Sequence, residues 1–345
     1  MKKRKILPIL ITAALTVSAL SGCAKSEPFD FRIIDAASST EYDIRAEITK
    51  ASPASDFGAP VSGDVLVYTG DGRILEADAA DVTVRPSGGV QVGREAYEKL
   101  TGIMTNADGL RRITDVYDLT VQALDRGERM MVIYLDGFGW QTYEKAVSGG
   151  LMPVLDGLRC DRAANVMPTI TPVNYAAMVT GRVPYDNGVT YRGMHRVNGE
   201  TMFDYCLALG KKPCVVESNT QILDFTCGQE LCTDTDGEFG TDNEVTDAAM
   251  AAMEREEPNL LFVHLHGIDD TSHAFSPESQ ELLLKLSETN GYLERLLGAW
   301  DGRVIICADH GLHENDGTGD PAYADRRGVH GDFAVSDIFT PIFTD

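Results

Sequence analysis

Short apolar runs alternate with amphipathic segments over the larger, C-terminal part of the chain. Runs that favour β-strands cover residues 130–136, 213–217, 259–269 and 303–311. Segments with apolar side chains at helical spacing lie between them, at residues 200–212 and 276–300. This alternation predicts an α/β fold in which helices cover both faces of a mostly parallel central sheet.

The segment 276–300 predicts a long helix with one buried face. Ser276 can cap its N-terminus, and Pro277 suits the first turn, where its nitrogen needs no hydrogen bond. Four leucines fall close to one face, and we expect them in the core rather than in a binding site. They are Leu282, Leu286, Leu293 and Leu297.

The N-terminal part of the chain has a different pattern. Residues 64–92 contain short β-branched runs separated by Gly-Asp-Gly and Pro-Ser-Gly-Gly, which favours hairpins. Residues 94–104 and 111–127 have the spacing of helices. We therefore predict a small N-terminal accessory module of strands and helices at residues 60–128, followed by a larger domain at residues 129–345.

The first residues have the layout of a bacterial export signal. Four basic residues precede an apolar stretch, and the sequence Leu-Ser-Gly-Cys ends at Cys23. This ending resembles the lipobox of bacterial lipoproteins, which implies that residues 1–22 are a signal peptide and that Cys23 is lipidated. A plain secretory signal and an uncleaved anchor are the alternatives. Each of these signals places the folded part of the chain outside the cytoplasm. We expect the polar residues 23–59 to form a tether between the membrane and that folded part.

Acidic residues outnumber basic ones, and export would increase the imbalance. The formal net charge is −23, and removal of residues 1–22 with their four basic side chains makes it −27. This charge disfavours binding to nucleic-acid duplexes and to anionic membrane surfaces, so we expect membrane contact through the N-terminal lipid only. A phosphate-binding site in such a chain needs metal ions or arginine to supply a local positive field.

Six cysteines follow Cys23, and none has the spacing of a metal-binding motif. Disulfides are permitted in an exported protein, and the nearest candidate pair is Cys227 with Cys232. The sequence does not choose among the possible pairings, and buried free thiols are the alternative.

Acidic and histidine side chains stand at the ends of three predicted strands, and a further histidine ends the later sequence RRGVH. In open parallel sheets, ligands bind beyond the carboxyl ends of the strands. The oxygen and nitrogen atoms of these side chains suit zinc-like divalent ions. The residues are Asp136, Asp269, Asp270, His273, Asp309, His310 and His330.

Residues 166–181, VMPTITPVNYAAMVTG, combine three threonines and two prolines with no charged side chain. This composition suits neither a core strand nor a surface loop. With YLDGFGW, IDDTSH, ADHG and GVHG in their order along the chain, it resembles the alkaline phosphatase superfamily, and most of all its nucleotide pyrophosphatase/phosphodiesterase branch. The resemblance covers roughly residues 130–345 and implies that the domain at residues 129–345 is an alkaline-phosphatase-like catalytic domain.

The resemblance further implies two divalent metal ions, with zinc as the expected metal. Two cations about 3.5 to 4 Å apart can stabilise both the attacking and the leaving oxygen of an in-line displacement. The ligands expected for one ion are Asp136, Thr171, Asp309 and His310, and those expected for the other are Asp269, His273 and His330.

Not every acidic or histidine side chain is expected to hold metal. Asp269 is preferred to Asp270 because the family places its carboxylate four residues before the histidine. The other histidines are expected to be hydrogen-bonded or solvated residues without a metal. These are His195, His264, His266 and His313.

Thr171 is the nucleophile that the resemblance implies. A threonine hydroxyl reacts poorly at neutral pH, but a bound cation stabilises its alkoxide, and Pro168 and Pro172 would hold the turn around it. The expected reaction is hydrolysis of a small phosphate ester or nucleotide by two displacements, through a phosphothreonine intermediate. A turn that leads into a helix is compatible with this role.

Arg192 and Asn174 are expected to contact the substrate. The family's phosphodiesterases usually carry an asparagine where this chain reads GVTYRGMH, and Arg192 stands there instead. A guanidinium favours a more highly charged ester than a diester. The sequence thus predicts a phosphodiesterase or nucleotide pyrophosphatase, with a phosphomonoesterase of the same superfamily as one alternative and a non-catalytic surface-binding lipoprotein as another.

Overall fold

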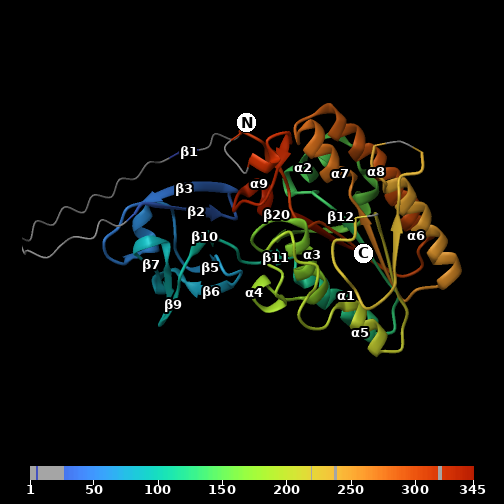
Figure 1. The fold of residues 1–345 in the computed structure, drawn as a ribbon, viewed down its shortest axis with the longest axis horizontal. Helices are drawn as coiled ribbons and strands as arrows, with labels where there is room; N and C mark the ends of the chain where they lie inside the picture. Colours follow the sequence, from blue (N-terminus) through green and yellow to red (C-terminus); the bar gives the residue numbers. More distant parts are fainter. Residues whose placement is uncertain (1–4, 7–26, 219, 237–238, 318–320) are drawn as a thin grey trace, which may run out of the picture. The chain divides into compact units, whose positions relative to one another are not determined.

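The computed structural model describes residues 5–6 and 27–345, apart from residues 219, 237–238 and 318–320. The chain forms two compact units, one of Met1–Gly109 with Phe333–Val335 and one of Leu110–Asp332 with Ser336–Asp345 (Figure 1). None of the described helices has both the length and the apolar composition needed to cross a membrane. Cys23 and, apart from residues 5–6, the predicted signal peptide lie outside the described residues.

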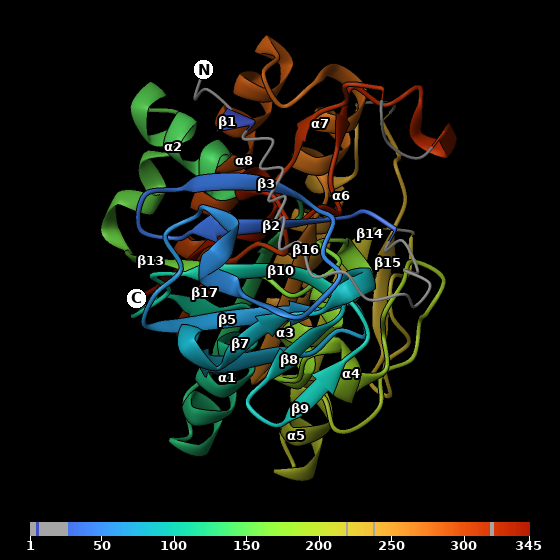
Figure 2. The ribbon, with the colours of Figure 1, turned by 90° about the vertical axis from the view of Figure 1, so that its left-hand side faces the viewer.

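The first unit is built from two sheets of short strands (Figure 2). Its core contains side chains from several strands, among them Ile33, Val67 and Ile103. The larger sheet has the order β1 (Lys5–Ile6), β3 (Thr40–Ala46), β2 (Phe29–Asp35), β10 (Leu100–Thr105), β5 (Asp64–Thr69) and β6 (Ile74–Asp78). The smaller has the order β4 (Ser52–Pro53), β7 (Val82–Val84), β8 (Val90–Val92) and β9 (Glu95–Tyr97).

The tether predicted at residues 23–59 contains the antiparallel pair β2 and β3. Phe31 and Ile33 alternate on the buried face of β2, which is half-buried in the way that favours a strand. The other edge of β2 pairs with β10, about 70 residues later in the chain. That long-range pairing makes part of the predicted tether a strand of the larger sheet of the first unit.

The helix predicted at residues 94–104 is wrong, because β9 and β10 occupy this segment. β10 lies between β2 and β5 and pairs with both, and these hydrogen bonds override the helical spacing. At Gly102 a Cβ atom would lie 2.3 Å from the Phe333 ring, so the packing requires glycine. The first unit ends at Gly109, whereas the predicted module extends to residue 128.

The second unit confirms the α/β fold with a mostly parallel sheet. Its eight strands have the order β11 (Arg111–Arg112), β13 (Arg159–Ala164), β20 (Phe339–Thr344), β17 (Arg303–Cys307), β12 (Met130–Leu135), β16 (Leu260–Leu265), β14 (Pro213–Ser218) and β15 (Gln229–Cys232). Neighbouring strands are parallel except at β20, which runs antiparallel to β13 and β17. β12 lies at the centre, parallel to both of its neighbours.

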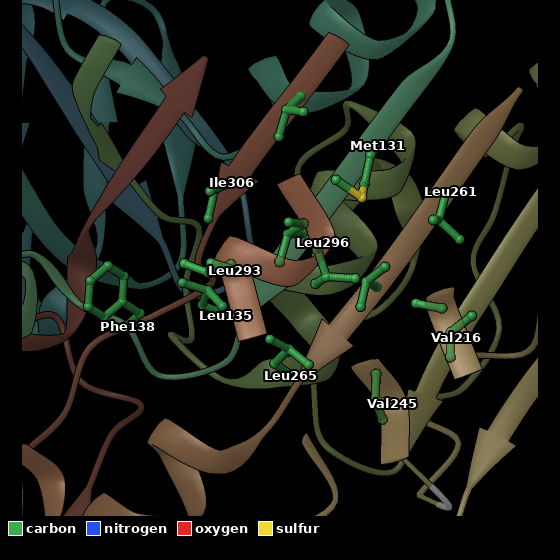
Figure 3. Packing of buried hydrophobic residues seen from close by; sticks show 14 of the residues in the cluster. Met131, Leu135, Phe138, Val216, Val245, Leu261, Leu265, Leu293, Leu296 and Ile306 are labelled. Atoms are coloured by element: carbon green, nitrogen blue, oxygen red, sulfur yellow. The ribbon is translucent and has the colours of Figure 1, made fainter. Parts of the chain in front are cut away.

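Helices cover both faces of this sheet. The described helices are α1 (Asp115–Asp125), α2 (Trp140–Gly149), α3 (Thr171–Thr180), α4 (Pro184–Asn187), α5 (Met202–Ala208), α6 (Asp242–Glu256), α7 (Gly267–Phe275), α8 (Gln280–Ala299) and α9 (Val335–Ile338). On one face, Met131 and Leu135 of β12 join a core cluster with side chains of α6 and α8 (Figure 3). On the other face, Tyr134 packs against Tyr175 of α3, with ring centroids 5.2 Å apart.

The predicted leucine face of the long helix is confirmed as core. Leu282, Leu286 and Leu293 are fully buried, and Leu297 packs partly buried against the same cluster. The cap differs from the prediction, because α8 begins at Gln280 and the side chain of Ser279 accepts the hydrogen bond from the Leu282 nitrogen. Ser276 lies outside this helix.

Candidate active site

The central strands of the second unit end in residues that the sequence singled out. Asp136 follows β12, Asp269 lies four residues after β16, and Asp309 lies two residues after β17. β12 is parallel to both neighbours, with Leu135 opposite Leu265 and Tyr134 opposite Cys307. The ends of the three strands therefore meet at one edge of the sheet, as expected for a ligand site in this fold.

Thr171 is the first residue of α3, and Pro172 occupies the first turn after it. Every side chain of α3 is buried, which explains why the segment 166–181 has no charged residue. The N-terminus of a helix carries a partial positive charge. A hydroxyl or an anion at Thr171 therefore lies at the favourable end of the helix.

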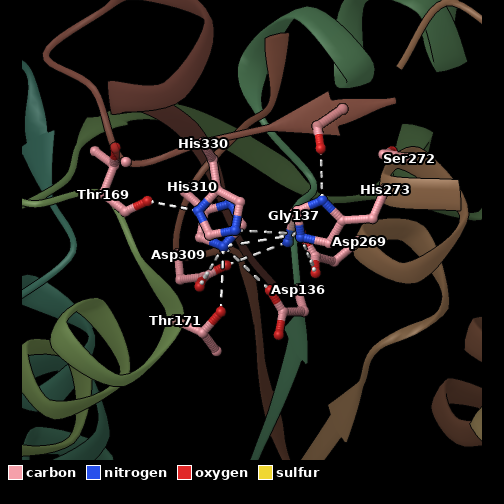
Figure 4. A network of polar contacts seen from close by, with 12 residues as sticks. Asp136, Gly137, Thr169, Thr171, Asp269, Ser272, His273, Asp309, His310 and His330 are labelled. Atoms are coloured by element: carbon pink, nitrogen blue, oxygen red, sulfur yellow. Dashed lines mark hydrogen bonds and ion pairs between the residues drawn. The ribbon is translucent and has the colours of Figure 1, made fainter. Parts of the chain in front are cut away.

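His310 connects the first group of predicted ligands (Figure 4). Its Nε2 atom lies 3.3 Å from the Thr171 hydroxyl oxygen, 3.1 Å from Asp309 Oδ2 and 3.4 Å from Asp136 Oδ1. All four residues are buried. The structure thus brings together the four residues that the sequence predicts around one ion.

Asp269, His273 and His330 form the second group. His273 Nε2 lies 3.1 Å from Asp269 Oδ2, and His330 Nε2 lies 3.9 Å from Asp269 Oδ1. The Nδ1 atoms of the two histidines lie 2.7 and 2.8 Å from the carbonyl oxygens of Gly328 and Thr169, to which they donate. Donation from Nδ1 leaves Nε2 as the ligand atom, the arrangement found in metal-binding histidines.

The neighbouring Asp270 is exposed, whereas Asp269 is buried beside the histidines. Asp269 and His273 lie four residues apart on α7 and therefore share one face of the helix. The geometry agrees with the choice of Asp269 over Asp270.

Three carboxylates meet in this site without hydrogen bonds for all their oxygens. Among the described residues, Asp136 Oδ1, Asp269 Oδ1 and Asp309 Oδ2 are buried and have no hydrogen-bond partner. Burial and the nearby Asp136 raise the pKa of Asp309 well above its usual range. Buried carboxylates are expected to be paired or to coordinate metal.

The ligand atoms also have the spacing that a shared ion requires. One set whose atoms lie within 4.8 Å of one another is Asp269, His273 and His330, and another is Asp136, Asp269 and His310. The donors are carboxylate oxygens and imidazole nitrogens, which suit zinc and similar divalent ions. The residues present therefore fit a pair of divalent cations.

His264 and His266, which we expected to be ordinary sheet residues, both contact Asp136. His264 Nε2 and His266 Nδ1 lie 3.2 and 3.1 Å from Asp136 Oδ2. Burial alone would raise the pKa of Asp136, but hydrogen bonds from both histidines lower it well below its usual range. The sequence did contain a signal for this contact. His264 and His266 lie two residues apart at the end of β16, and β16 pairs with β12, the strand that ends before Asp136.

His264 also has contacts at its second ring nitrogen and on its ring face. Its Nδ1 atom lies 3.6 Å from Oε2 of the buried Glu217, and its ring stacks on Tyr134 with centroids 3.9 Å apart. Glu217 also accepts hydrogen bonds from Tyr175 and Gln229. A buried chain of polar contacts thus extends from Glu217 through His264 to Asp136.

The histidines expected in loops lie apart from the ligand groups. His195 Nδ1 lies 2.9 Å from the Ile222 carbonyl oxygen. His313 Nδ1 lies 2.7 Å from Asp337 Oδ1, and Asp337 Oδ2 accepts the backbone N–H of Gly331, next to His330. His313 therefore supports the loop that carries a predicted ligand.

Arg192, one of the two residues expected to contact the substrate, reaches the second group. Its Nη2 atom lies 3.1 Å from His330 Nε2. A second arginine, which the sequence analysis did not select, is in the equivalent place at the other histidine, with Arg326 Nη1 2.5 Å from His273 Nε2. Arg326 is the first residue of RRGVH, the sequence that ends in the predicted ligand His330, but the sequence analysis selected only the histidine.

Asn174, the other expected substrate contact, has a different position. It is fully buried, with Oδ1 accepting from the Val166 nitrogen and Nδ2 donating to the Val166 and Pro168 carbonyl oxygens. All of its hydrogen-bonding groups are engaged within the turn that precedes α3. The geometry contradicts a substrate contact and indicates that Asn174 positions the Thr171 turn.

The six cysteines after Cys23 are free thiols, so the candidate pair of Cys227 and Cys232 is not a disulfide in this structure. Burial raises the pKa of the Cys227 thiol to about 12. The alternative of free thiols is the one observed, and all are buried except Cys160 and Cys227, which are partly buried.

Comparison with a family model supports the same motifs. The model for type I phosphodiesterase / nucleotide pyrophosphatase matches residues 130–234 and 214–326, more than half of the chain. The matched residues include Asp136, Thr171, Asp309 and His310 but end before His330. No curated protein matches the chain in sequence.

Several solved structures are also similar. Phosphonoacetate hydrolase from Sinorhizobium meliloti, in complex with phosphonoacetate, is 18% identical with a TM-score of 0.46, over 55% of this chain and 58% of that one. An inactive variant of murine ectonucleotide pyrophosphatase/phosphodiesterase 5, in complex with AMP, is 14% identical with a TM-score of 0.48. That match covers 63% of this chain and 87% of the murine protein. This chain thus covers less than two thirds of the phosphonoacetate hydrolase.

Proposed function

Because the chain belongs to the type I phosphodiesterase/nucleotide pyrophosphatase family, we propose that it is an exported, metal-dependent hydrolase of phosphodiester or nucleotide pyrophosphate bonds. The observation that carries the proposal is the position of the Thr171 hydroxyl. It is buried, begins a helix and lies 3.3 Å from His310, in a site where three buried carboxylates each have an oxygen without a hydrogen-bond partner among the described residues. A threonine hydroxyl with only a structural role would not require a histidine and several buried carboxylates around it.

Two groups of side chains would hold the divalent ions. Zinc is the metal that their donor atoms favour. When bound, the two ions would supply positive charge that stabilises the attacking and leaving oxygens. The groups are Asp136, Thr171, Asp309 and His310 for one ion, and Asp269, His273 and His330 for the other.

Thr171 is the proposed nucleophile. Its oxygen forms a bond to phosphorus while the bond from phosphorus to the leaving alcohol or nucleotide breaks. Water then attacks the phosphothreonine, releases the phosphate product and restores the hydroxyl. The positive end of α3 favours the oxygen as its negative charge develops, and Asn174 keeps the turn before it in place.

The bond type is tested with a panel of substrates. We expect the purified, zinc-loaded chain to hydrolyse bis-p-nitrophenyl phosphate and a nucleotide pyrophosphate with higher kcat/KM than p-nitrophenyl phosphate, and to leave p-nitrophenyl sulfate intact. A monoester advantage of more than about tenfold, or about 1.4 kcal/mol of transition-state stabilisation, would contradict the diesterase proposal. A phosphomonoesterase is then the alternative, favoured by Arg192 beside His330.

The proposed location is the outer side of a bacterial membrane, with lipid attached at Cys23. The support comes from the sequence Leu-Ser-Gly-Cys and from the basic and apolar residues before it. A protein with a net charge of −27 after processing is not expected to bind nucleic-acid duplexes. A non-catalytic surface lipoprotein remains the less favoured alternative, because every expected ligand is present.

A further inference from the structure

Two arginines from separate loops reach the second group of ligands. Arg326 Nη1 lies 2.5 Å from His273 Nε2, and Arg192 Nη2 lies 3.1 Å from His330 Nε2. We propose that Arg192 and Arg326 form one anion-binding subsite, which strengthens the binding of substrates that carry a second negative charge at or next to the scissile phosphorus. This inference rests on the proposed function and adds Arg326 and a substrate class to it.

Among the described residues, no carboxylate forms an ion pair with either guanidinium. Arg192 and Arg326 contact histidine and tyrosine instead. The chain has 53 acidic residues against 30 lysines and arginines, and Arg196, near Arg192, does pair with Asp224 at 3.3 Å. Two arginines without acidic partners among the described residues of so acidic a protein provide a local positive field for an anion.

Tyr323 lies close to both arginines. Its ring centroid is 5.4 Å from Cζ of Arg192 and 4.8 Å from Cζ of Arg326, distances at which a guanidinium interacts with an aromatic ring. Asn315 Nδ2 donates to the backbone carbonyls of Tyr323 and Arg326 at 3.0 and 2.9 Å. The backbone at Tyr323 and Arg326 is thus held in place, which reduces the entropy lost when an anion binds.

The two arginines would need a new acceptor when the site holds a metal. Nε2 of His273 and His330 accepts from the arginines here, yet it is also the atom of each ring that is free to ligate an ion. A ligating nitrogen no longer accepts a hydrogen bond, so each guanidinium keeps donors for another partner. Phosphate oxygens match those donors in pairs, and the attraction grows with the charge on the phosphate.

The second negative charge has two chemical sources. A phosphate monoester carries it on the scissile phosphorus itself, and a pyrophosphate carries it on the adjacent phosphate group. A simple diester such as bis-p-nitrophenyl phosphate has a single negative charge. The two arginines are therefore expected to matter less for the diester than for the other two classes.

The experiment compares Arg192→Ala, Arg326→Ala and Arg326→Lys with Arg196→Ala as the matched control. Titration calorimetry on the full zinc-loaded chain measures the affinity for inorganic phosphate. We expect each alanine variant to weaken phosphate binding at least about tenfold, and Arg196→Ala to change it less than about twofold. Arg326→Lys should fall between, because it keeps the charge without the paired donors.

Kinetics then separate the two sources of charge. In Arg192→Ala and Arg326→Ala, we expect kcat/KM to fall at least about tenfold below wild type for p-nitrophenyl phosphate, for ADP-ribose or for both. For bis-p-nitrophenyl phosphate we expect it to fall less than about threefold. Loss on the monoester alone identifies the scissile phosphate as the source, and loss on ADP-ribose alone identifies the adjacent one.

Equal losses on all three substrates, or a loss of bound zinc in the alanine variants, would overturn the inference in favour of a role in positioning the histidines. Unchanged phosphate affinity would overturn it as well. If the wild-type chain hydrolyses none of these esters, the proposed function fails, and the phosphate titration still decides whether the subsite exists.

Discussion

Thr171 and His310 lie 139 positions apart in the chain, yet the threonine hydroxyl oxygen is 3.3 Å from the histidine Nε2 atom. The contact forms because α3 begins at Thr171 and because His310 follows a central strand of the sheet. Both side chains are buried. The hydroxyl is thereby placed among the carboxylates at the strand ends, where a bound cation would activate it.

We predict that Thr171→Ala lowers kcat/KM for the best substrate by at least about 10³-fold, because the covalent route is lost while the remaining ligands stay. Thr171→Ser should keep part of the activity, since it restores a hydroxyl. Steady-state kinetics check both variants. Thr180→Ala, a buried threonine at the other end of α3, is the control and should remain active. A Thr171→Ala variant with more than about a tenth of wild-type activity would refute the assignment.

Metal loading should add two divalent ions per chain and raise the melting temperature, because the three buried carboxylates would then have counter-charges. A metal concentration of 1,000 times Kd stabilises the folded state by about 4 kcal/mol. Elemental analysis and calorimetry before and after chelation measure both effects. His273→Ala should reduce the metal content toward one ion, whereas the exposed His195→Ala should not. Fewer than one ion per reconstituted wild-type chain would exclude the two-metal site.

His264→Phe tests the buried contacts behind Asp136. Phenylalanine can keep the stacking on Tyr134 but cannot donate to Asp136 or approach Glu217 as a polar partner. We expect metal affinity to fall about 10- to 100-fold, the usual effect of losing a partner that orients a ligand. Competition with a chromogenic chelator measures this affinity. An unchanged value would mean that His264 contributes packing alone.

Asn174→Ala should lower the free energy of unfolding by about 2 to 3 kcal/mol, because three buried hydrogen bonds are lost. We expect KM to change less than about threefold in the folded protein, since the side chain is engaged within the turn. Denaturant titration and kinetics measure the two quantities. A large rise in KM at unchanged stability would restore the original prediction of a substrate contact.

Cys23→Ser should release the protein from bacterial membranes or block its processing. Lipid attachment at this cysteine is the proposed anchor, and a single acyl chain anchors only marginally, so several chains are expected on the mature N-terminus. Cell fractionation and mass spectrometry of the N-terminal peptide provide the measurements. Cys160→Ser is the control for loss of a thiol. An unchanged membrane fraction, without added lipid mass on the wild-type peptide, would contradict the proposal.

The alternation of apolar runs with helical spacing was sufficient to predict the fold class of the second unit and its strands β12, β14, β16 and β17, because these are local patterns that packing reinforces. The strand at Met130–Leu135 is one example, and the leucine face of α8 is another. The alternation did not predict β11, β13, β15 or β20. The pattern failed at residues 94–104, where pairing of β10 with two distant strands overrides helical spacing. It also failed at β2, whose partner β10 is far away in the chain.

By itself, the sequence determined the parallel α/β fold and where the acidic and histidine side chains of the site stand, since the ends of parallel strands meet at one edge. Only the tertiary structure decided which side chains surround those groups. His264 and His266 contact Asp136, Asn174 points into its own turn, and Arg326 reaches His273. These contacts depend on side-chain direction and on neighbouring strands and loops, which residue order does not specify.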